Sequence, residues 1–428
     1  MSQIDLLIHN AAQLITCAPQ GKGPVRGKAM RDLAIIPNGA AAIHQGGIIA
    51  VGPSANIVSN FTARSSVDAK GRVVCPGFVD AHTHIVYAGD RVAEFEMRVQ
   101  GAAYLDILAA GGGIISTTRQ VRQASVADLV AQTRPRLETM LRHGTTTAEI
   151  KTGYGLDTAS ELKMLTAIEE LARRQPVALV PTFLPAHAVP TEFAGRADDY
   201  VQLVIDTMIP QAAQWYRASS FAAQKTPFFI DVFCEKNAFS LDQSRRILEA
   251  GVKHGMRVKA HVDEFVNLDG SLMASALGAV SIDHLDVTTP EQIAQLAQTS
   301  TVCVAIPAVN FHLGNPHFSD ARAMIDAGAA VALATDFNPG SAPCPSMQFV
   351  MALACRYQKL SPDEALLACT INGAYAVGLG EVCGSLEPGK WGDVLIFDVP
   401  DYRHLAYQFG GNQVREVIRK GRTVWSRN

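Results

Sequence analysis

From residue 76 onward, short apolar segments alternate with longer amphipathic ones. The apolar segments are rich in Val, Ile, Phe and Ala, which is typical of buried strands. We expect strands at Phe78–Ala81, Thr145–Ile150, Val177–Phe183, Phe228–Phe233, Arg257–Ala260, Ser281–Asp283, Val302–Ile306 and Val331–Thr335. Helical spacing of apolar residues predicts helices at about Thr158–Arg174, Ser240–His254, Pro290–Thr299, Asp320–Ala327, Ser346–Tyr357 and Pro362–Gly378. A further helix should begin at the capping-box pair Ser125 and Asp128 and end at Gly144.

Strands that alternate with helices in this way indicate a parallel sheet, and eight such strands close a (β/α)8 barrel of the TIM-like kind. The predicted fold class is therefore α/β. In such barrels the active site lies at the C-terminal ends of the strands, so functional side chains are expected there or just beyond.

The two ends of the chain have a different pattern, of short strands separated by turns. We expect a strand at Ile4–Ile8, a hairpin over 41–52 that turns at Gly46–Gly47, and strands at Asp393–Asp398 and Val414–Trp425. The C-terminal part is too short for a domain of its own. We therefore predict one small β-domain built from residues 1–75 and 380–428, joined to a barrel domain at residues 76–379.

Composition narrows the class of protein. The chain of 428 residues has 48% hydrophobic and 18% charged residues, which is typical of a soluble globular protein. Its net charge of -3 gives no electrostatic reason to expect nucleic acid or a membrane as a partner. Eight scattered cysteines without a C-x-x-C pair, and a start without the features of a signal peptide, lead us to expect a cytoplasmic location.

Histidines and a carboxylate recur where the predicted strands end. His82 and His84 follow the first strand, and their i, i+2 spacing places both side chains on one face. The other three, His261, His284 and Asp336, follow the fifth, sixth and eighth strands. One such residue could be an ordinary core or surface histidine, but the recurrence at four strands predicts a metal site for one divalent ion, zinc or iron.

The chemistry of such a site is hydrolytic. A divalent ion lowers the pKa of a bound water, Asp336 can bind the ion and accept the proton, and Glu264 can protonate a leaving nitrogen. For His284 three roles stay open: orienting the water, binding the metal itself, or only forming a hydrogen bond to a residue that binds the metal.

Two motifs, Pro76–His84 and Gly384–Asp393, together with the strand ends at His261, His284 and Asp336, resemble those of the amidohydrolase superfamily. Within it, longer motifs are similar to those of the imidazolonepropionase family and occur in the same order: His82–Arg91, Glu149–Gly155, Leu184–His187, His261–Glu264 and Thr335–Ser341. The resemblance implies one metal held by His82, His84, His261 and Asp336. It also implies hydrolysis of 4-imidazolone-5-propanoate to N-formimino-L-glutamate in histidine degradation. Around this small-molecule substrate it places Arg91, Tyr104, Tyr154, His187, Glu264, Asn338, Gly340 and Ser341.

Physical reasoning suggests roles for several of these residues. Arg91 can pair with the substrate carboxylate or form a surface ion pair, and Tyr154 can face the substrate or only pack. We predict that His187 polarises the ring carbonyl as a catalytic group, and that the loop at 338–341 binds a second polar end of the ligand. Lys151 raises the alternative of a carboxylated lysine bridging two metals, and the segment 88–124 is a candidate lid.

Two other functions would share part of this pattern, either the metal ligands or the fold. An aminohydrolase acting on an exocyclic amine would share the metal ligands, and ammonia release would distinguish it. A non-catalytic scaffold on the same fold would have lost those ligands, all of which are present here. We expect a homodimer, the commonest oligomer.

Overall fold

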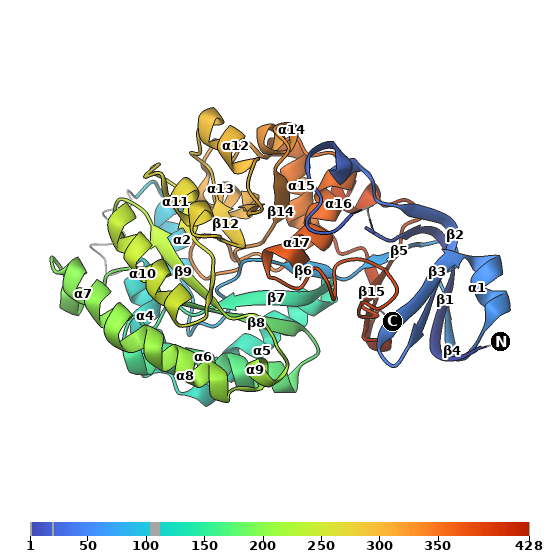
Figure 1. The fold of residues 1–428 in the computed structure, drawn as a ribbon, viewed down its shortest axis with the longest axis horizontal. Helices are drawn as coiled ribbons and strands as arrows, with labels where there is room; N and C mark the ends of the chain where they lie inside the picture. The colour runs from blue at the N-terminus through green and yellow to red at the C-terminus, as the bar shows by residue number, and fades with distance from the viewer. Residues whose placement is uncertain (1, 19–20, 103–111, 428) are drawn as a thin grey trace.

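The computed structural model describes residues 2–18, 21–102 and 112–427 (Figure 1). Two sheets organise this part of the chain. The larger one is parallel and surrounded by helices, and the smaller one is built from both chain ends and lies to one side of it in Figure 1. Among the described helices, none combines the length and the hydropathy that crossing a bilayer requires.

The parallel sheet has the strand order of a (β/α)8 barrel, with each strand beside the next one in the sequence. Its members are β6 (Phe78–Asp80), β7 (Thr145–Lys151), β8 (Ala178–Ala186), β9 (Phe229–Cys234), β10 (Arg257–Val258), β11 (His261–Val262), β12 (Ser281–His284), β13 (Val302–Ala305) and β14 (Ala330–Leu333). The predicted fold class and all eight predicted strands are confirmed. The fifth strand is divided, since β10 pairs only with β9 whereas β11 pairs with β9 and β12.

The first and last strands meet along a seam that completes the barrel. Thr83 and Phe337 form an isolated parallel bridge, and the amide of His84 donates to the carbonyl of Phe337 over 3.0 Å. The amide of Asp336 donates to the carbonyl of His82, also over 3.0 Å. We call these contacts the seam. The seam joins the residues that directly follow β6 to those that follow β14.

Helices cover the outside of the barrel, and half of those named next lie where the apolar spacing predicts them. They are α2 (Val92–Val99), α4 (Ile114–Gln123), α5 (Val126–Arg142), α6 (Thr158–Arg174), α7 (Ala197–Leu203), η3 (Val204–Met208), α8 (Ile209–Ala218), α9 (Ser220–Ala223), α10 (Leu241–Lys253), α11 (Gly270–Ala276), α12 (Pro290–Leu296), α13 (Pro307–Leu313), α14 (Ala321–Asp326), α15 (Met347–Tyr357), α16 (Pro362–Ala368) and α17 (Ile371–Ala376). The capping box that starts α5 is present, because Ser125 Oγ accepts from the Asp128 amide and the Asp128 carboxylate accepts from the Ser125 amide.

The helical region predicted over 362–378 is present as two helices, α16 and α17. Between them, the carbonyl of Cys369 accepts a hydrogen bond from the amide of Val79 in β6. Gly373 in α17 lies so close to that strand that a Cβ atom there would be 2.6 Å from the Val79 carbonyl oxygen. The break therefore lets two short helices pack directly on the first strand.

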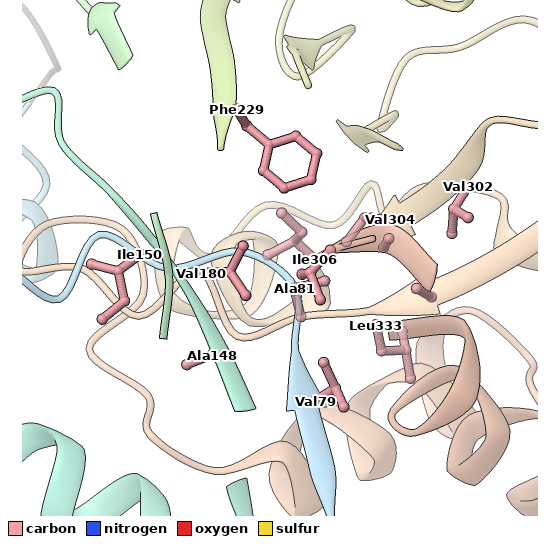
Figure 2. Packing of buried hydrophobic residues seen from close by; sticks show 14 of the residues in the cluster. Val79, Ala81, Ala148, Ile150, Val180, Phe229, Val302, Val304, Ile306 and Leu333 are labelled. Atoms are coloured by element: carbon pink, nitrogen blue, oxygen red, sulfur yellow. The ribbon is translucent and has the colours of Figure 1, made fainter. Parts of the chain in front are cut away.

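Alternation along the strands separates the packing face from the polar face. In β7, Ala148 and Ile150 alternate with Glu149 and Lys151, and all four are fully buried. Figure 2 shows the apolar side chains that six of the strands, with the residues that follow them, contribute to the core: Val79, Ala81, Ala148, Ile150, Val180, Phe229, Val302, Val304, Ile306 and Leu333. The charged residues of the same strands are thereby left inside the barrel.

The smaller sheet joins the two ends of the chain, as predicted. Its order is β17–β16–β15–β5–β1–β2–β3 with β4 beside β1, and its strands are β1 (Ser2–Ile15), β2 (Ile35–His44), β3 (Gly47–Pro53), β4 (Phe61–Asp68), β5 (Val73–Pro76), β15 (Val394–Phe397), β16 (Val414–Arg419) and β17 (Arg422–Ser426). The short helix α1 (Ser54–Asn60) packs against strands β1 to β4, whereas α18 (His404–Tyr407) packs against α15 and α16. The domain boundaries at 75/76 and 379/380 stay a prediction.

Two turns differ from the predicted positions. The hairpin of β2 and β3 turns at Gln45–Gly46, one residue earlier than predicted, with φ of 50° and 80° at those residues. Positive φ at both central residues is typical of a type I′ turn. The predicted strand Val414–Trp425 is likewise two strands, which turn at Lys420 and Gly421.

The segment before β2 reaches across to the barrel helices. Arg31, at the end of the short helix η1 (Gly27–Arg31), pairs with Glu364 of α16 at 3.0 Å, and Arg322 of α14 pairs with the same carboxylate at 2.6 Å. Burial alone would raise the pKa of Glu364, but hydrogen bonds from Arg322, the Ser361 amide and Arg31 lower it to about 2. This carboxylate therefore ties the N-terminal part of the chain to two helices.

We predict that Glu364→Gln lowers the free energy of unfolding at pH 7 by about 1–3 kcal/mol, because charge-assisted hydrogen bonds are lost. A carboxyl whose folded pKa is depressed stabilises the fold above its unfolded value and stops doing so as the pH falls through the folded value. The difference between variant and wild type should therefore shrink between about pH 4.5 and 2 in thermal unfolding experiments. Glu138→Gln, which removes a surface ion pair to Arg134, is the control. An equally large, pH-independent effect of Glu364→Gln would contradict the prediction.

Candidate metal centre

Five polar side chains meet at the C-terminal rim of the barrel. His82 and His84 follow β6, His261 begins β11, His284 ends β12 and Asp336 follows β14. Each is at most 3% exposed. The strands are parallel and adjacent, so their C-terminal ends form one rim, and the structure brings together all five residues that the sequence analysis singled out.

The donor atoms of this cluster form two overlapping groups, each with its atoms within 4.8 Å of one another: His82 with His84 and His261, and His82 with His284 and Asp336. His84 Nε2 lies 3.2 Å from His82 Nε2 and 3.1 Å from His261 Nε2. Asp336 Oδ1 lies 3.5 Å and 3.4 Å from the Nε2 atoms of His82 and His84. Ligands about 2.1 Å from a tetrahedral zinc ion are themselves about 3.4 Å apart, so these separations fit a shared cation.

Two aspartates hold the imidazoles in the orientation that metal binding requires. Asp283 Oδ2 lies 2.7 Å from His82 Nδ1, and Asp231 Oδ1 lies 3.1 Å from His261 Nδ1. A carboxylate can only accept here, so each Nδ1 carries the proton and each Nε2 keeps its lone pair for a cation. The sequence analysis missed both aspartates as functional residues. The available signal was an acidic residue inside an otherwise apolar strand.

The remaining donors also fit a cation. Among the described residues, the buried Oδ1 atom of Asp336 has no hydrogen-bond partner, although two imidazole nitrogens surround it. Burial lowers the pKa of His82 and His84 well below the usual range, so both rings are neutral at physiological pH. Neutral imidazoles and a carboxylate are the ligand types that bind zinc or iron in proteins.

Glu264 and His284 form a second pair next to these donors. His284 Nε2 lies 3.7 Å from Glu264 Oε2, and both side chains are buried. Burial, followed by the nearby charge of Asp336, raises the pKa of Glu264 well above its usual range. Burial thus favours the protonated form of Glu264, which is the form that a proton donor needs.

The backbone is strained at two residues of the rim. His284 has a φ of 83° and Asp336 a φ of 50°, in the left-handed region of backbone conformation that residues other than glycine rarely adopt. Such strain persists only where surrounding contacts impose it, and it is concentrated at functional sites. At Asp336 the imposing contact is the seam.

Tyr154 and His187 lie against the histidine cluster. The ring of His187 stacks on that of His84, with centroids 4.8 Å apart, and the Tyr154 ring lies 5.9 Å from His84. His187 Nδ1 is 3.0 Å from the carbonyl oxygen of Gly153, which can only accept, so the proton of the neutral ring is on Nδ1. Burial, followed by His261, lowers the pKa of His187 to about 3. In this state Nε2 is an acceptor.

The other described residues that are predicted to bind substrate contact one another or residues close to them in the sequence. Arg91 pairs with Glu94 at 2.8 Å, and its guanidinium lies against Gly340, where a Cβ atom would be 2.0 Å from Nη1. Asn338 Oδ1 accepts from the amides of Gly340 and Ser341, both over 2.8 Å, so these amides are already bonded within the loop. Tyr104 and part of the candidate lid at 88–124 lie outside the described residues.

The sequence matches the model of the amidohydrolase family over residues 73–424. It is 56% identical over 424 residues to the imidazolonepropionase of Chloroflexus aggregans, covering 99% of both chains. It is 44% identical to that of Geobacillus kaustophilus, covering 98% of this chain and 97% of the relative. The fold is similar to that of an adenosine deaminase from Xanthomonas campestris with bound zinc, with a TM-score of 0.70 and 19% identity over 99% of this chain and 93% of that chain. For Escherichia coli guanine deaminase the TM-score is 0.67 at 17% identity, with 99% of both chains covered.

We predict that His261→Ala abolishes tight metal binding, because one of three converging imidazoles is lost. Elemental analysis of the purified protein should find about one zinc or iron ion per chain in the wild type and far less in the variant. His254→Ala is the control, since that histidine is exposed and lies outside the cluster. Equal metal content in His261→Ala and wild type would disprove this site.

Proposed function

This chain belongs to the amidohydrolase family and, within it, to the imidazolonepropionases, and we propose that it hydrolyses 4-imidazolone-5-propanoate to N-formimino-L-glutamate. The observation that supports this most directly is the buried Glu264 carboxyl, whose pKa is raised by burial, beside His82, His84, His261 and Asp336. Opening a cyclic amide needs an activated water and a proton for the departing nitrogen, and this cluster offers a residue for each task.

We propose that His82, His84, His261 and Asp336 hold one divalent cation, zinc or iron. When bound, this cation supplies Lewis acidity, polarising the ring carbonyl and making water a better nucleophile near neutral pH. The four donor atoms are buried, which keeps bulk water away and strengthens their electrostatic interactions. The excess negative charge of the carboxylates behind the imidazoles also favours a cation.

The chain's own residues move the protons. Asp336 accepts a proton as the water oxygen bonds to the ring carbonyl carbon. The bond between that carbon and the ring nitrogen then breaks, and Glu264 gives its proton to the departing nitrogen. His284, which lies beside Glu264, orients this carboxyl group. One water is consumed, and the amide becomes a carboxylate and a formimino nitrogen.

We assign His187 a different part from the one first expected. A neutral ring that donates through Nδ1 to Gly153 cannot also donate through Nε2 to a carbonyl oxygen. His187 Nε2 instead accepts a hydrogen bond from an N–H group of the substrate ring. This contact orients the heterocycle over the cluster, where Tyr154 packs beside it.

The propionate arm of the substrate is assigned to Arg91. Its Nε and Nη2 atoms hydrogen-bond or pair with Glu94, so Glu94 fixes the guanidinium while Nη1 stays available beside Gly340. Asn338 and Ser341 shape the same loop. We further propose a cytoplasmic homodimer with neither nucleic acid nor membrane as a partner, and size-exclusion chromatography with light scattering tests the dimer.

Incubation with freshly generated imidazolone propionate should cause a metal-dependent loss of the ring's ultraviolet absorbance without release of ammonia. Ring opening keeps both nitrogens in the product, whereas an aminohydrolase would release one as ammonia. An ammonia assay run in parallel separates the two activities. Stoichiometric ammonia, or no reaction by metal-loaded protein, would overturn the proposed function.

We predict that Glu264→Gln lowers kcat by roughly 10²- to 10⁴-fold, because an amide cannot donate its proton to the departing nitrogen. The metal content should not change, since Glu264 is outside the converging donor set. Glu235→Gln, at a neighbouring carboxylate that instead accepts from the Phe265 and Val266 amides, serves as a control for altered charge. Unchanged kcat in Glu264→Gln would remove this residue from the mechanism.

A further inference from the structure

A lysine is buried directly behind the histidine cluster. Lys151 ends β7, and its side chain is completely buried. Its Nζ atom lies 2.8 Å from Glu149 Oε1, 2.7 Å from Asp231 Oδ2 and 3.6 Å from Asp283 Oδ2. All three carboxylates are also completely buried. None of the reaction steps above uses this ammonium group.

Two of its neighbours are the aspartates that orient metal-binding histidines. Asp231 uses Oδ1 for His261 and Oδ2 for Lys151, so it lies between the ring and the ammonium group. Asp283 Oδ2 faces both His82 and Lys151. One ammonium group is therefore connected through two carboxylates to two imidazoles on different strands.

We propose that Lys151 is a positioning residue for the metal site, which fixes Asp231 and Asp283 and through them orients His82 and His261 together. The physical basis is that a buried carboxylate needs a buried positive partner. Without the ammonium group, Asp231 Oδ2 loses its hydrogen-bond donor and Asp283 loses one of its two positive partners, so each carboxylate holds its histidine less firmly. The imidazole then loses its fixed tautomer and direction, which costs metal affinity.

The same geometry argues against the alternative of Lys151 as a metal-bridging carboxylated lysine. Carboxylation would replace a positive group by a negative one in contact with three carboxylates. Although burial alone would lower the pKa of Lys151, these carboxylates raise it above its usual range. Lys151 is thus held as an ammonium ion, with its hydrogen-bond donors directed at the carboxylates.

A second buried lysine provides an internal comparison. Lys259 Nζ lies 3.5 Å from Asp283 Oδ2 and contacts Ser281 Oγ, which itself donates to Asp283 Oδ1. Lys259 has no ion pair with Asp231 among the described residues. Lys259 can therefore support only the His82 arm, whereas Lys151 supports both.

The test measures zinc affinity of the full chain by competition with a chromophoric chelator, after removal of the bound metal. Lys151→Gln, which keeps a donor but removes the charge, should bind zinc roughly 10- to 100-fold more weakly than wild type. Lys259→Met should show a smaller loss. The matched control is Lys390→Met. Lys390 is also a buried lysine, but its Nζ atom donates to the Gly380 carbonyl and to Ser385 Oγ, and neither partner belongs to the histidine cluster.

Combined variants show whether the effect passes through the aspartates. In an Asp231→Asn, Asp283→Asn background, adding Lys151→Gln should change zinc affinity by much less than it does in wild type, because the residues it acts through are gone. An undiminished effect would overturn the proposal. So would a Lys151→Gln protein, folded by circular dichroism, with the zinc affinity of Lys390→Met.

A second variant protects the test against misfolding. If Lys151→Gln does not fold, Lys151→Met is used, since its flexible apolar side chain fills a similar volume. At saturating zinc, the folded variant should recover most of the wild-type kcat, which a role in the chemical steps would not allow. The proposal rests on the proposed metal site but not on the substrate, so zinc affinity can support it even where imidazolone propionate is not turned over.

Discussion

The need to neutralise charges that are shut away from water governs the interior of this barrel. Two lysines and three carboxylates, Lys151, Lys259, Glu149, Asp231 and Asp283, are completely buried near its centre. Removing such groups from water is costly, so each must contact an opposite charge in good geometry. Their arrangement in turn determines how the imidazoles of His82 and His261 point. Because negative groups outnumber positive ones among these five, the network favours a cation at the rim.

Strand alternation explains how one set of strands can serve both packing and chemistry. The apolar residues in Figure 2 pack the core, and in β7 the positions next to Ala148 and Ile150 carry Glu149 and Lys151. The residues assigned to the substrate lie mainly in the loops beyond the rim, as with Arg91 and Asn338. Loops can change without disturbing the strands, which is consistent with a shared fold at 16–19% identity to enzymes named for other substrates.

Much of the fold could be predicted because the apolar periodicity is regular. Helix α6 occupies exactly the residues expected, and each predicted strand is present. Two details differ from the local pattern: the helical region at 362–378 is divided where Cys369 bonds to β6, and the first hairpin turns at Gln45–Gly46. The histidines could be predicted from their repeated position at strand ends. For Asp231 the sequence shows an acidic residue inside an apolar strand, and for Lys151 a lysine after the second predicted strand. Their partners could not be predicted, because these depend on how the strands curve into a barrel.

The seam makes the histidine cluster part of barrel closure as well as part of the proposed metal site. His82 and Asp336 are hydrogen-bonded to each other through their backbones and also carry donor atoms on either side of the joint between the first and last strands. The neighbouring contact between Asp80 and Thr335 spans 255 positions of the chain. A cation held by these side chains would therefore act as a cross-link that closes the long loop of chain between the first and last strands. Since barrel closure and donor convergence depend on the same residues, a molecule whose barrel opens at this joint loses its catalytic centre before it loses most of its helices.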